Sequence, residues 1–272
     1  IPRGEKFTVS GKATAILTTE NTLKYYAGID LGGTGIKCGI VDENGKIVAI
    51  KKCPTKKGVE AKEILLDMAN LVKDLQKETG LKLEGVGVGC PGLIDTEKGN
   101  VVYSNNLAWK NVPLVKTLKD ELKLPVYVTN DANAAALGEY HFGAGKRYKS
   151  LVMLTLGTGV GSGIVFNGKL FEGNLGAGVE LGHEVIRIGG EKCTCGRKGC
   201  LEAYASATAL IRQAQKAMDG DKDSLLWKLT DGNKENVNGK VVFDALREGD
   251  KTAEKVVKKY TEYLAAGVTN VI

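Results

Sequence analysis

The same order of elements occurs twice in this 272-residue sequence: a strand, a glycine-rich loop, a second strand, a tight turn and a third strand. The first copy covers residues 25–53, with the loop DLGGTGIK at 30–37 and an Asn-Gly turn at 44–45. The second covers residues 150–171, with the loop LGTGVGSG at 156–163 and an Asn-Gly turn at 167–168. Because helical patterns follow each copy, the sequence predicts an α/β protein of two lobes with a ligand cleft between them.

Hydrophobic periodicity predicts the other elements. Apolar residues recur at helical spacing in residues 60–79, and Gly80 is expected to end that helix. Further helices are predicted over residues 113–122, 132–142, 206–218, 243–247 and 252–271, and further strands over 84–89 and 125–129. We place the lobe boundary near residue 130. The expected parts are an extension (1–24), a small lobe (25–129) and a large lobe (130–272).

Both glycine-rich loops have the composition of phosphate-binding loops. Glycines let backbone N–H groups approach an anion, while threonine and lysine side chains add a donor and a positive charge. A glycine-rich β-turn would explain either loop alone, but two such loops in matching halves favour nucleotide binding. The candidate nucleotide-binding residues are Asp30, Gly32, Gly33, Thr34 and Lys37 in the first loop and Gly157, Thr158 and Gly159 in the second.

Two other nucleotide-binding motifs are excluded. No segment matches the Walker A pattern. Residues 87–92 match G-x-G-x-x-G after a predicted strand, but residues 93–99 are predicted to form a loop rather than the helix that this motif requires. The sequence therefore predicts neither a P-loop ATPase nor a dinucleotide-binding fold.

A C-x-C-x₄-C motif and an upstream histidine form a candidate metal site. Three thiolates and one imidazole suit tetrahedral, structural Zn²⁺. A disulfide is the alternative, but it would leave one of the three cysteines unpaired. The predicted ligands are His183, Cys193, Cys195 and Cys200. The other cysteines stand singly at 38, 53 and 90, which favours reduced thiols and a cytoplasmic location.

Seven ordered motifs resemble those of the ROK family (repressors, open reading frames, kinases) from about residue 25 to the end. They are GIDLGGT (28–34), GVGCPGLID (87–95), SNNLAW (104–109), TNDANAAALGE (129–139), LGTGVGSG (156–163), ELGH (180–183) and CTCGRKGCLEAYAS (193–206). The resemblance implies a two-lobed, actin-like ATPase (ribonuclease H-like) fold. It also implies an ATP- and Mg²⁺-dependent sugar kinase, most commonly one for glucose, and a homodimer.

By that resemblance Asp131 is the general base, although its position before the helix at 132–142 also suits an N-cap. His183 would serve twice, with one ring nitrogen on zinc and the other on a sugar hydroxyl. The resemblance implies that the sugar-binding residues are Asn106, Asn130, Asp131, Glu180, His183 and Glu202.

Charge and apolar segments argue against nucleic-acid and membrane partners. The net charge is +6, but the lysines are scattered, and no stretch approaches 18 apolar residues. A repressor of the same family would need a winged-helix module before the first loop, and only 24 residues precede that lobe. A non-catalytic sugar-binding protein and kinases for N-acetylmannosamine, fructose or allose stay open. Because the family continues with a strand and a helix, we expect the large lobe to be incomplete at its C-terminal end.

Overall fold

A five-stranded sheet forms the first half of the protein. The computed structural model describes residues 6–9, 13–16, 23–173 and 179–272 of the chain. The strands lie in the order β10-β6-β3-β4-β5. Their bounds are β3 (Tyr25–Leu31), β4 (Gly35–Asp42), β5 (Ile47–Pro54), β6 (Leu83–Cys90) and β10 (Val126–Asn130). The pairs β3–β4 and β4–β5 are antiparallel, so the predicted three-stranded start is confirmed. The pairs β3–β6 and β6–β10 are parallel, which brings the ends of these three strands to one edge.

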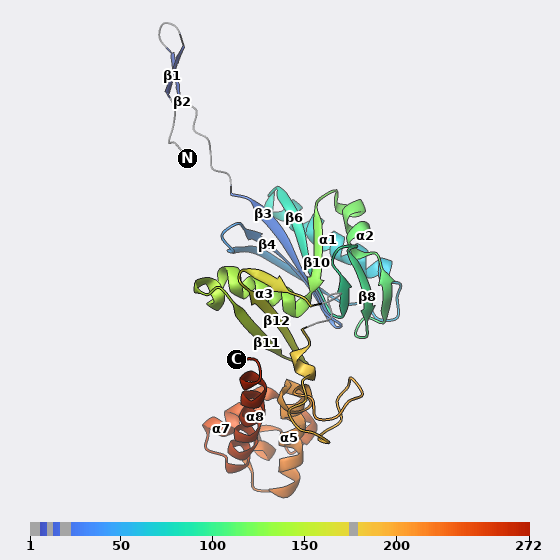
Figure 1. Cartoon of the computed structure of the whole chain (residues 1–272), viewed down its shortest axis with the longest axis vertical. Coiled ribbons are helices and arrows are strands. Elements are labelled where there is room, and N and C mark those ends of the chain that lie inside the picture. Colours follow the sequence, from blue (N-terminus) through green and yellow to red (C-terminus); the bar gives the residue numbers. More distant parts are fainter. Residues whose placement is uncertain (1–5, 10–12, 17–22, 174–178) are drawn as a thin grey trace.

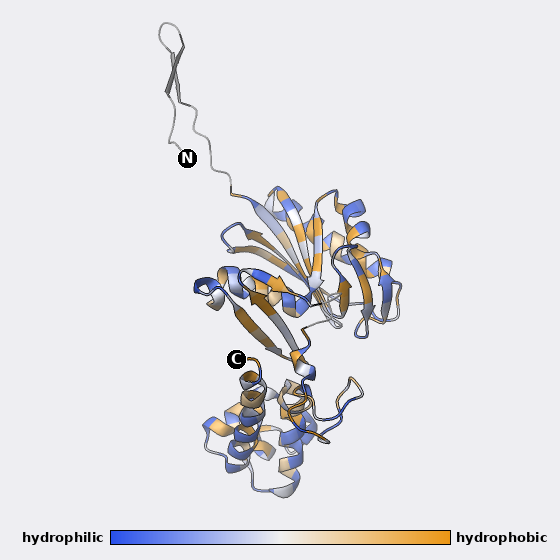
Figure 2. Cartoon of the chain, viewed as in Figure 1, coloured by the Kyte–Doolittle hydropathy of each residue, from blue (hydrophilic) through white to orange (hydrophobic). Residues whose placement is uncertain are grey.

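Two helices pack in the first half, α1 (Ala61–Thr79) against β4 and β5 and α2 (Leu114–Leu122) against α1 and β10. The apolar side chains of α1 point to the sheet, and Met68, Val72 and Leu75 are at most 1% exposed. Burying each such side chain contributes about 1.5–3 kcal/mol. Gly80 ends α1 with φ 68°, as predicted, because a left-handed residue at that position favours glycine. Figures 1 and 2 show these helices beside strands rich in apolar residues.

The prediction of a loop over residues 93–99 is confirmed for residues 96–99, which form a turn, and is wrong for residues 93–95, which form a strand. These residues begin a three-stranded antiparallel sheet of β7 (Leu93–Asp95), β8 (Asn100–Ser104) and β9 (Trp109–Val112). Gly92, with φ 113°, explains why G-x-G-x-x-G occurs here. A Cβ at Gly92 would lie 2.2 Å from the Tyr103 carbonyl oxygen, so the glycine permits close approach of two backbones rather than a helix start.

The second half begins with α3 (Asp131–Phe142), which contacts both sheets. A short 3₁₀ turn, η1 (Ala144–Arg147), leads from α3 to the antiparallel sheet of β11 (Leu151–Leu156), β12 (Val160–Phe166) and β13 (Lys169–Phe171). One side of α3 packs on β11 and β12, and another contacts β6 and β10 (Figure 1). The predicted lobe boundary therefore falls at the turn between the last strand of the first sheet and the helix that both halves share.

A helical layer completes the second half. It contains α4 (Glu202–Ala205), α5 (Ala207–Gly220), α6 (Leu225–Leu229), η4 (Lys234–Asn236), α7 (Gly239–Arg247) and α8 (Lys251–Thr269). Helices α5 and α8 lie within two residues of their predicted bounds, α7 begins four residues before its predicted start at 243, and the short helices α4 and α6 were not predicted. Leu210, Met218 and Leu226 are at most 3% exposed in its core.

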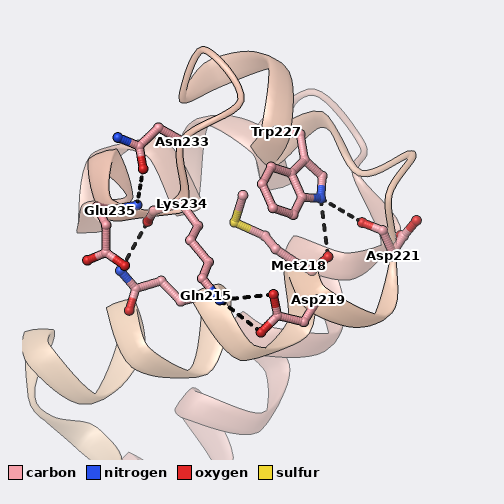
Figure 3. A network of polar contacts seen from close by, with 8 residues as sticks. All are labelled: Gln215, Met218, Asp219, Asp221, Trp227, Asn233, Lys234 and Glu235. Atoms are coloured by element: carbon pink, nitrogen blue, oxygen red, sulfur yellow. Dashed lines mark hydrogen bonds and ion pairs between the residues drawn. The ribbon is translucent and has the colours of Figure 1, made fainter.

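Polar contacts fix the connection between α5 and α6 (Figure 3). The Trp227 indole N–H donates to the carbonyl oxygens of Met218 and Asp221, at 3.2 and 3.0 Å. Lys234 reaches back to the Asp219 carboxylate at 3.0 Å. These contacts hold the far end of α5, whose near end lies beside the second glycine-rich loop.

Within the predicted extension, β1 (Lys6–Val9) and β2 (Ala13–Ile16) form an antiparallel hairpin, which Figure 1 shows apart from the two halves. None of the helices in the described ranges combines the length and apolarity that crossing a membrane requires.

Candidate functional site

A cavity of about 960 Å³ lies between the first sheet and α3. Residues from both halves line it, so it corresponds to the ligand cleft that the sequence predicts. Most of its lining is apolar, and its polar lining residues include Asp30, Lys37, Thr129, Asp131, Thr155 and Glu172. A few converging polar groups in a mostly apolar cavity are typical of a ligand-binding site.

The first glycine-rich loop connects β3 to β4 at the edge of this cavity. The Gly32 N–H donates to the Gly35 carbonyl at 2.9 Å, and the Thr55 hydroxyl donates to the Gly32 carbonyl at 2.6 Å. Asp30 and Lys37 form an exposed ion pair at 3.2 Å. The N–H groups of Gly33 and Thr34 have no acceptor among the described residues, so both are free to bind an anion.

The second glycine-rich loop connects β11 to β12 and has the same character. The Gly157 N–H donates to the Gly159 carbonyl at 3.0 Å, and the Val160 N–H donates to a Glu202 carboxylate oxygen at 3.1 Å. In the described part of the chain, the N–H groups of Thr158 and Gly159 are not paired. The chain thus presents two similar backbone cradles, one from each half.

The first residue of α3 is Asp131, and the N-cap predicted for this residue is wrong. Asn130 is the cap, because its side-chain oxygen accepts from the N–H groups of Ala132 and Asn133 at 2.9 and 3.3 Å. Asp131 is one of the residues that line the cavity, and its carboxylate accepts from the Ala132 N–H at 2.9 Å. Loss of water contact within the cleft raises the pKa of Asp131, and the negative charge of Asp30 raises it further.

The two predicted sugar-binding asparagines, Asn130 and Asn106, differ in their contacts. The Asn130 amide nitrogen donates to the Gly92 carbonyl at 3.3 Å, so backbone groups already use both ends of its side chain. Asn106 is exposed in the turn between β8 and β9. Its backbone lies against the first loop, because a Cβ at Gly33 would be 3.3 Å from the Asn106 carbonyl oxygen.

The other predicted sugar-binding residues form a charged group with Asp131. Glu180 and His183 belong to a segment that includes η3 (Leu181–His183), and β12 supports this segment. The Ser162 hydroxyl donates to the Val179 carbonyl at 2.7 Å and accepts from the Leu181 N–H at 3.0 Å. Partial loss of hydration raises the pKa of Glu180; the charge of His183 opposes this shift, and the charges of Asp131 and Glu202 add to it. Glu180 therefore lies within the electrostatic influence of all three groups.

The four predicted metal ligands converge. Their ligand atoms all lie within 4.8 Å of one another. The Cys195 and Cys200 sulfurs are 3.7 Å apart, and the Cys193 sulfur lies 3.5 Å from the His183 Nδ1. A tetrahedral site with Zn–S bonds of about 2.3 Å has S···S edges of about 3.8 Å and S···N edges of about 3.6 Å. The donor set and its spacing therefore fit a closed, four-coordinate metal site.

Local groups shift the thiol pKa values in this cluster. The backbone N–H of Arg197 lowers the pKa of Cys195, whereas burial raises the pKa values of Cys193 and Cys200. A bound cation lowers the pKa of any thiol that ligates it, because it stabilises the thiolate. Arg197 also closes the loop by donating to the His183 carbonyl at 2.9 Å.

Sequence reasoning missed several side chains that support the site. They are Thr55, Ser162, Glu172 and Thr194. Thr55 and Glu172 lie outside the quoted motifs and contact segments 23 and 43 residues away, whereas Ser162 and Thr194 lie within the motifs at 156–163 and 193–206 but were given no role there. Glu172 is an example: it follows β13 and accepts from the Thr129 hydroxyl at 3.1 Å, next to the Asn130-Asp131 pair. The contact joins the two halves at the cavity wall.

Comparison with known proteins places this site in a family. Residues 26–272 match the ROK family. The glucokinase of Thermotoga maritima is 42% identical over 248 residues, which are 90% of this chain and 77% of that protein. A ROK family glucokinase from Streptomyces griseus, solved in complex with glucose and AMPPNP, is 36% identical with a TM-score of 0.79, covering 92% of this chain and 79% of that one.

A regulator is also among the relatives. The xylose repressor of Caldicellulosiruptor bescii is 31% identical over 277 residues, which span 100% of this chain and 68% of the repressor. The match over residues 26–272, the two backbone cradles and the shared two-lobed fold agree with one another. The chain therefore belongs to the ROK family.

Proposed function

We propose that this chain is an ATP-dependent sugar kinase that transfers the γ-phosphate of ATP to glucose. The position of Asp131 carries this proposal. Asp131 lines the cavity together with Asp30 and Lys37, which flank the first glycine-rich loop, and Thr155, which precedes the second; its raised pKa is typical of a carboxylate that accepts a proton during a reaction. The similarity to two proteins described as glucokinases supports glucose as the substrate.

In the proposed reaction, the sugar 6-hydroxyl oxygen attacks the γ-phosphorus while the bond to ADP breaks. Asp131 accepts the hydroxyl proton as the new P–O bond forms. The free N–H groups of Gly33, Thr34, Thr158 and Gly159 bind phosphate oxygens, and Lys37 adds a positive charge. Mg²⁺ bound with ATP supplies charge neutralisation on the phosphates, and Asp30 at the end of β3 is the residue that would hold it.

Sugar hydroxyls need donors and acceptors, which the remaining predicted residues supply. Glu180 is exposed and provides an acceptor, and the Asn106 amide provides both kinds of group. The His183 Nδ1 faces the cysteines, so its Nε2–H is the donor left for the sugar. One Glu202 oxygen accepts from the Thr194 hydroxyl and from the Cys193 thiol, whereas the other accepts only from the Val160 N–H and keeps a lone pair for a sugar hydroxyl.

The Cys₃His cluster would hold structural Zn²⁺ in this proposal. Its role is to fix the segment of Glu180 and His183, with no part in phosphoryl transfer. Elemental analysis of the purified protein should find about one zinc per chain, and Cys195→Ser should lose it. Stoichiometric zinc in the Cys195→Ser protein, or none in the wild type, would contradict the assignment.

A sugar panel tests the proposed activity. ADP release from ATP is measured with glucose, N-acetylmannosamine, fructose, allose and xylose, with Asp131→Asn as the control variant. We expect glucose to give the highest kcat/KM and the control to give almost no ADP. A higher kcat/KM for another hexose would support the kinase activity but contradict glucose as the substrate.

A second candidate is a non-catalytic, sugar-binding regulator. The observation that favours it is the match to the xylose repressor, which spans the whole chain and includes the extension before β3. Titration separates the two candidates. A regulator would bind a sugar without releasing ADP from ATP, and Asp131→Asn would not change its function beyond sugar affinity. The predicted homodimer and cytoplasmic location stay predictions.

A further inference from the structure

Glu202, at the start of α4, contacts two loops with its two carboxylate oxygens. One oxygen accepts from the Thr194 hydroxyl at 2.7 Å, within the loop that carries the three metal-site cysteines. The other accepts from the Val160 N–H at 3.1 Å, at the end of the second glycine-rich loop. This carboxylate therefore connects the Cys₃His cluster to one of the two phosphate cradles.

The second loop is shaped to receive this carboxylate. A Cβ at residue 159 would lie 2.3 Å from the same Glu202 oxygen, so glycine leaves the space that the carboxylate occupies. The neighbouring Ala207 N–H donates to the Gly157 carbonyl at 2.9 Å. Both ends of the cradle are thus held by residues that follow directly after the cysteine motif.

Thr194 stands between two of the predicted metal ligands, Cys193 and Cys195. Its backbone position is consequently set by the geometry of the cluster. When the cluster is closed around a metal, the Thr194 hydroxyl is fixed at the distance at which it binds Glu202. When the cluster is open, Cys193 and Cys195 are no longer held by a metal, and the hydroxyl keeps, besides its bond to Glu202, only a 3.9 Å contact with the Cys193 sulfur.

We propose that Thr194 is a positioning residue which, through Glu202, couples metal binding at the Cys₃His cluster to nucleotide binding at residues 157–160. The inference rests on the proposed function, because it takes those residues as part of the ATP site. It adds a regulatory link that the sugar-binding role of this region does not contain. Zinc would raise the affinity for nucleotide and not only that for sugar.

The test uses Thr194→Val, which keeps the shape of the side chain and removes the hydroxyl, with Thr194→Ser as the matched control. Titration calorimetry measures MgADP affinity for each protein with zinc bound and after removal by a zinc-selective chelator. Elemental analysis confirms the zinc content. Hydrogen exchange at the Val160 N–H gives a readout that does not depend on activity.

With zinc bound, we expect Thr194→Val to bind MgADP about 3- to 10-fold more weakly than the wild type, and Thr194→Ser within twofold of it. Zinc removal should weaken the wild type and the Ser variant by a similar factor but change the Val variant little. The Val160 N–H should exchange faster in the Val variant.

Equal MgADP affinity of Thr194→Val and the wild type would overturn the inference. So would an effect of zinc removal that is as large in the Val variant as in the wild type, because the two changes would then be independent. A wild-type protein that binds no MgADP would instead refute the proposed function itself.

Discussion

The two glycine-rich loops have similar sequences, but different parts of the chain hold them. The first is fixed by its own sheet: Gly32 pairs with Gly35, and Thr55 at the end of β5 binds the Gly32 carbonyl. The second is fixed by Glu202 and Ala207, which lie more than 40 residues further along the chain. The first loop is a local structure, whereas the second depends on the helical layer and the cysteine motif.

Two loops with similar sequences can therefore be held in shape by hydrogen bonds from different parts of the chain. The first loop should keep its shape whenever its antiparallel sheet is folded. The second should respond to changes in the metal cluster and in α4. Variants that remove one support at a time can therefore test the comparison.

The largest effect is expected for Asp131→Asn, which leaves both loops intact. The amide keeps an oxygen for the Ala132 N–H but cannot act as a base, so kcat should fall by about 10²–10⁴-fold. ADP and glucose affinities, measured by titration calorimetry, should stay within a few-fold of the wild type. A kcat close to that of the wild type would contradict the role of Asp131 as general base. The two loops would then be compared only by their effects on binding.

Gly159→Ala should break the support of the second loop. The added methyl group displaces the Glu202 carboxylate and so removes its bond to the Val160 N–H; we expect MgADP to bind about tenfold more weakly. Gly157→Ala is the control, because its Cβ would meet no atom within 4 Å. If both variants lose affinity equally, the loss reflects the phosphate contacts of the loop and not its support.

Thr55→Val should weaken the first loop by a smaller amount. Losing one neutral hydrogen bond to the Gly32 carbonyl costs about 1 kcal/mol, which corresponds to about a fivefold weaker MgADP affinity. Thr55→Ser should restore it. The loss should be the same with and without zinc, since no contact links this loop to the cysteines in the described structure. A zinc-dependent loss would contradict the local character of the first loop.

The smallest effect concerns stability and pH. Asp30 faces Lys37 in the first half, whereas Asp131 has no cationic partner within 4.0 Å in the described ranges. Because the cleft raises the pKa of Asp131, ionisation of this group destabilises the folded state, and this loss appears as pH rises through the raised pKa. Asp131→Asn should therefore have a slightly higher Tm than the wild type at pH 7–8, and the gap should shrink near pH 4.

Asp120→Asn is the control with the opposite sign. Lys116 lowers the pKa of Asp120, so its ionised form stabilises the fold above its usual pKa and the benefit is lost as pH falls. The amide variant should have a slightly lower Tm at neutral pH and match the wild type in acid. Thermal unfolding monitored by circular dichroism measures both differences.

Sequence periodicity was sufficient for the long elements. It predicted α1 with its Gly80 cap, and it predicted three strands within residues 25–53, where β3 to β5 extend from 25 to 54. These elements depend on local patterns of apolar residues and on turn chemistry. The sheet of β7 to β9 was missed because its strands have three to five residues, too few to show alternation.

Sequence alone predicted residues of the candidate site only where they belong to a known motif. The four metal ligands lie together as expected, since their spacing in the chain already restricts them. The N-cap assignment of Asp131 was wrong because two adjacent residues, Asn130 and Asp131, both suit a cap, and only the tertiary structure shows which one turns back. Supports such as Thr55 and Glu172 come from contacts with distant segments that no local pattern encodes.

The shared helix α3 has a mechanical consequence. It packs on β6 and β10 on one side and on β11 and β12 on the other, so it lies at the junction about which the two sheets would turn. Points near a rotation axis move little, while points far from it sweep long arcs. Asp131 is the first residue of that helix, whereas Thr34 and Thr158 project from loops on separate sheets. Opening the cleft would therefore carry the two phosphate cradles apart while the carboxylate stays almost in place.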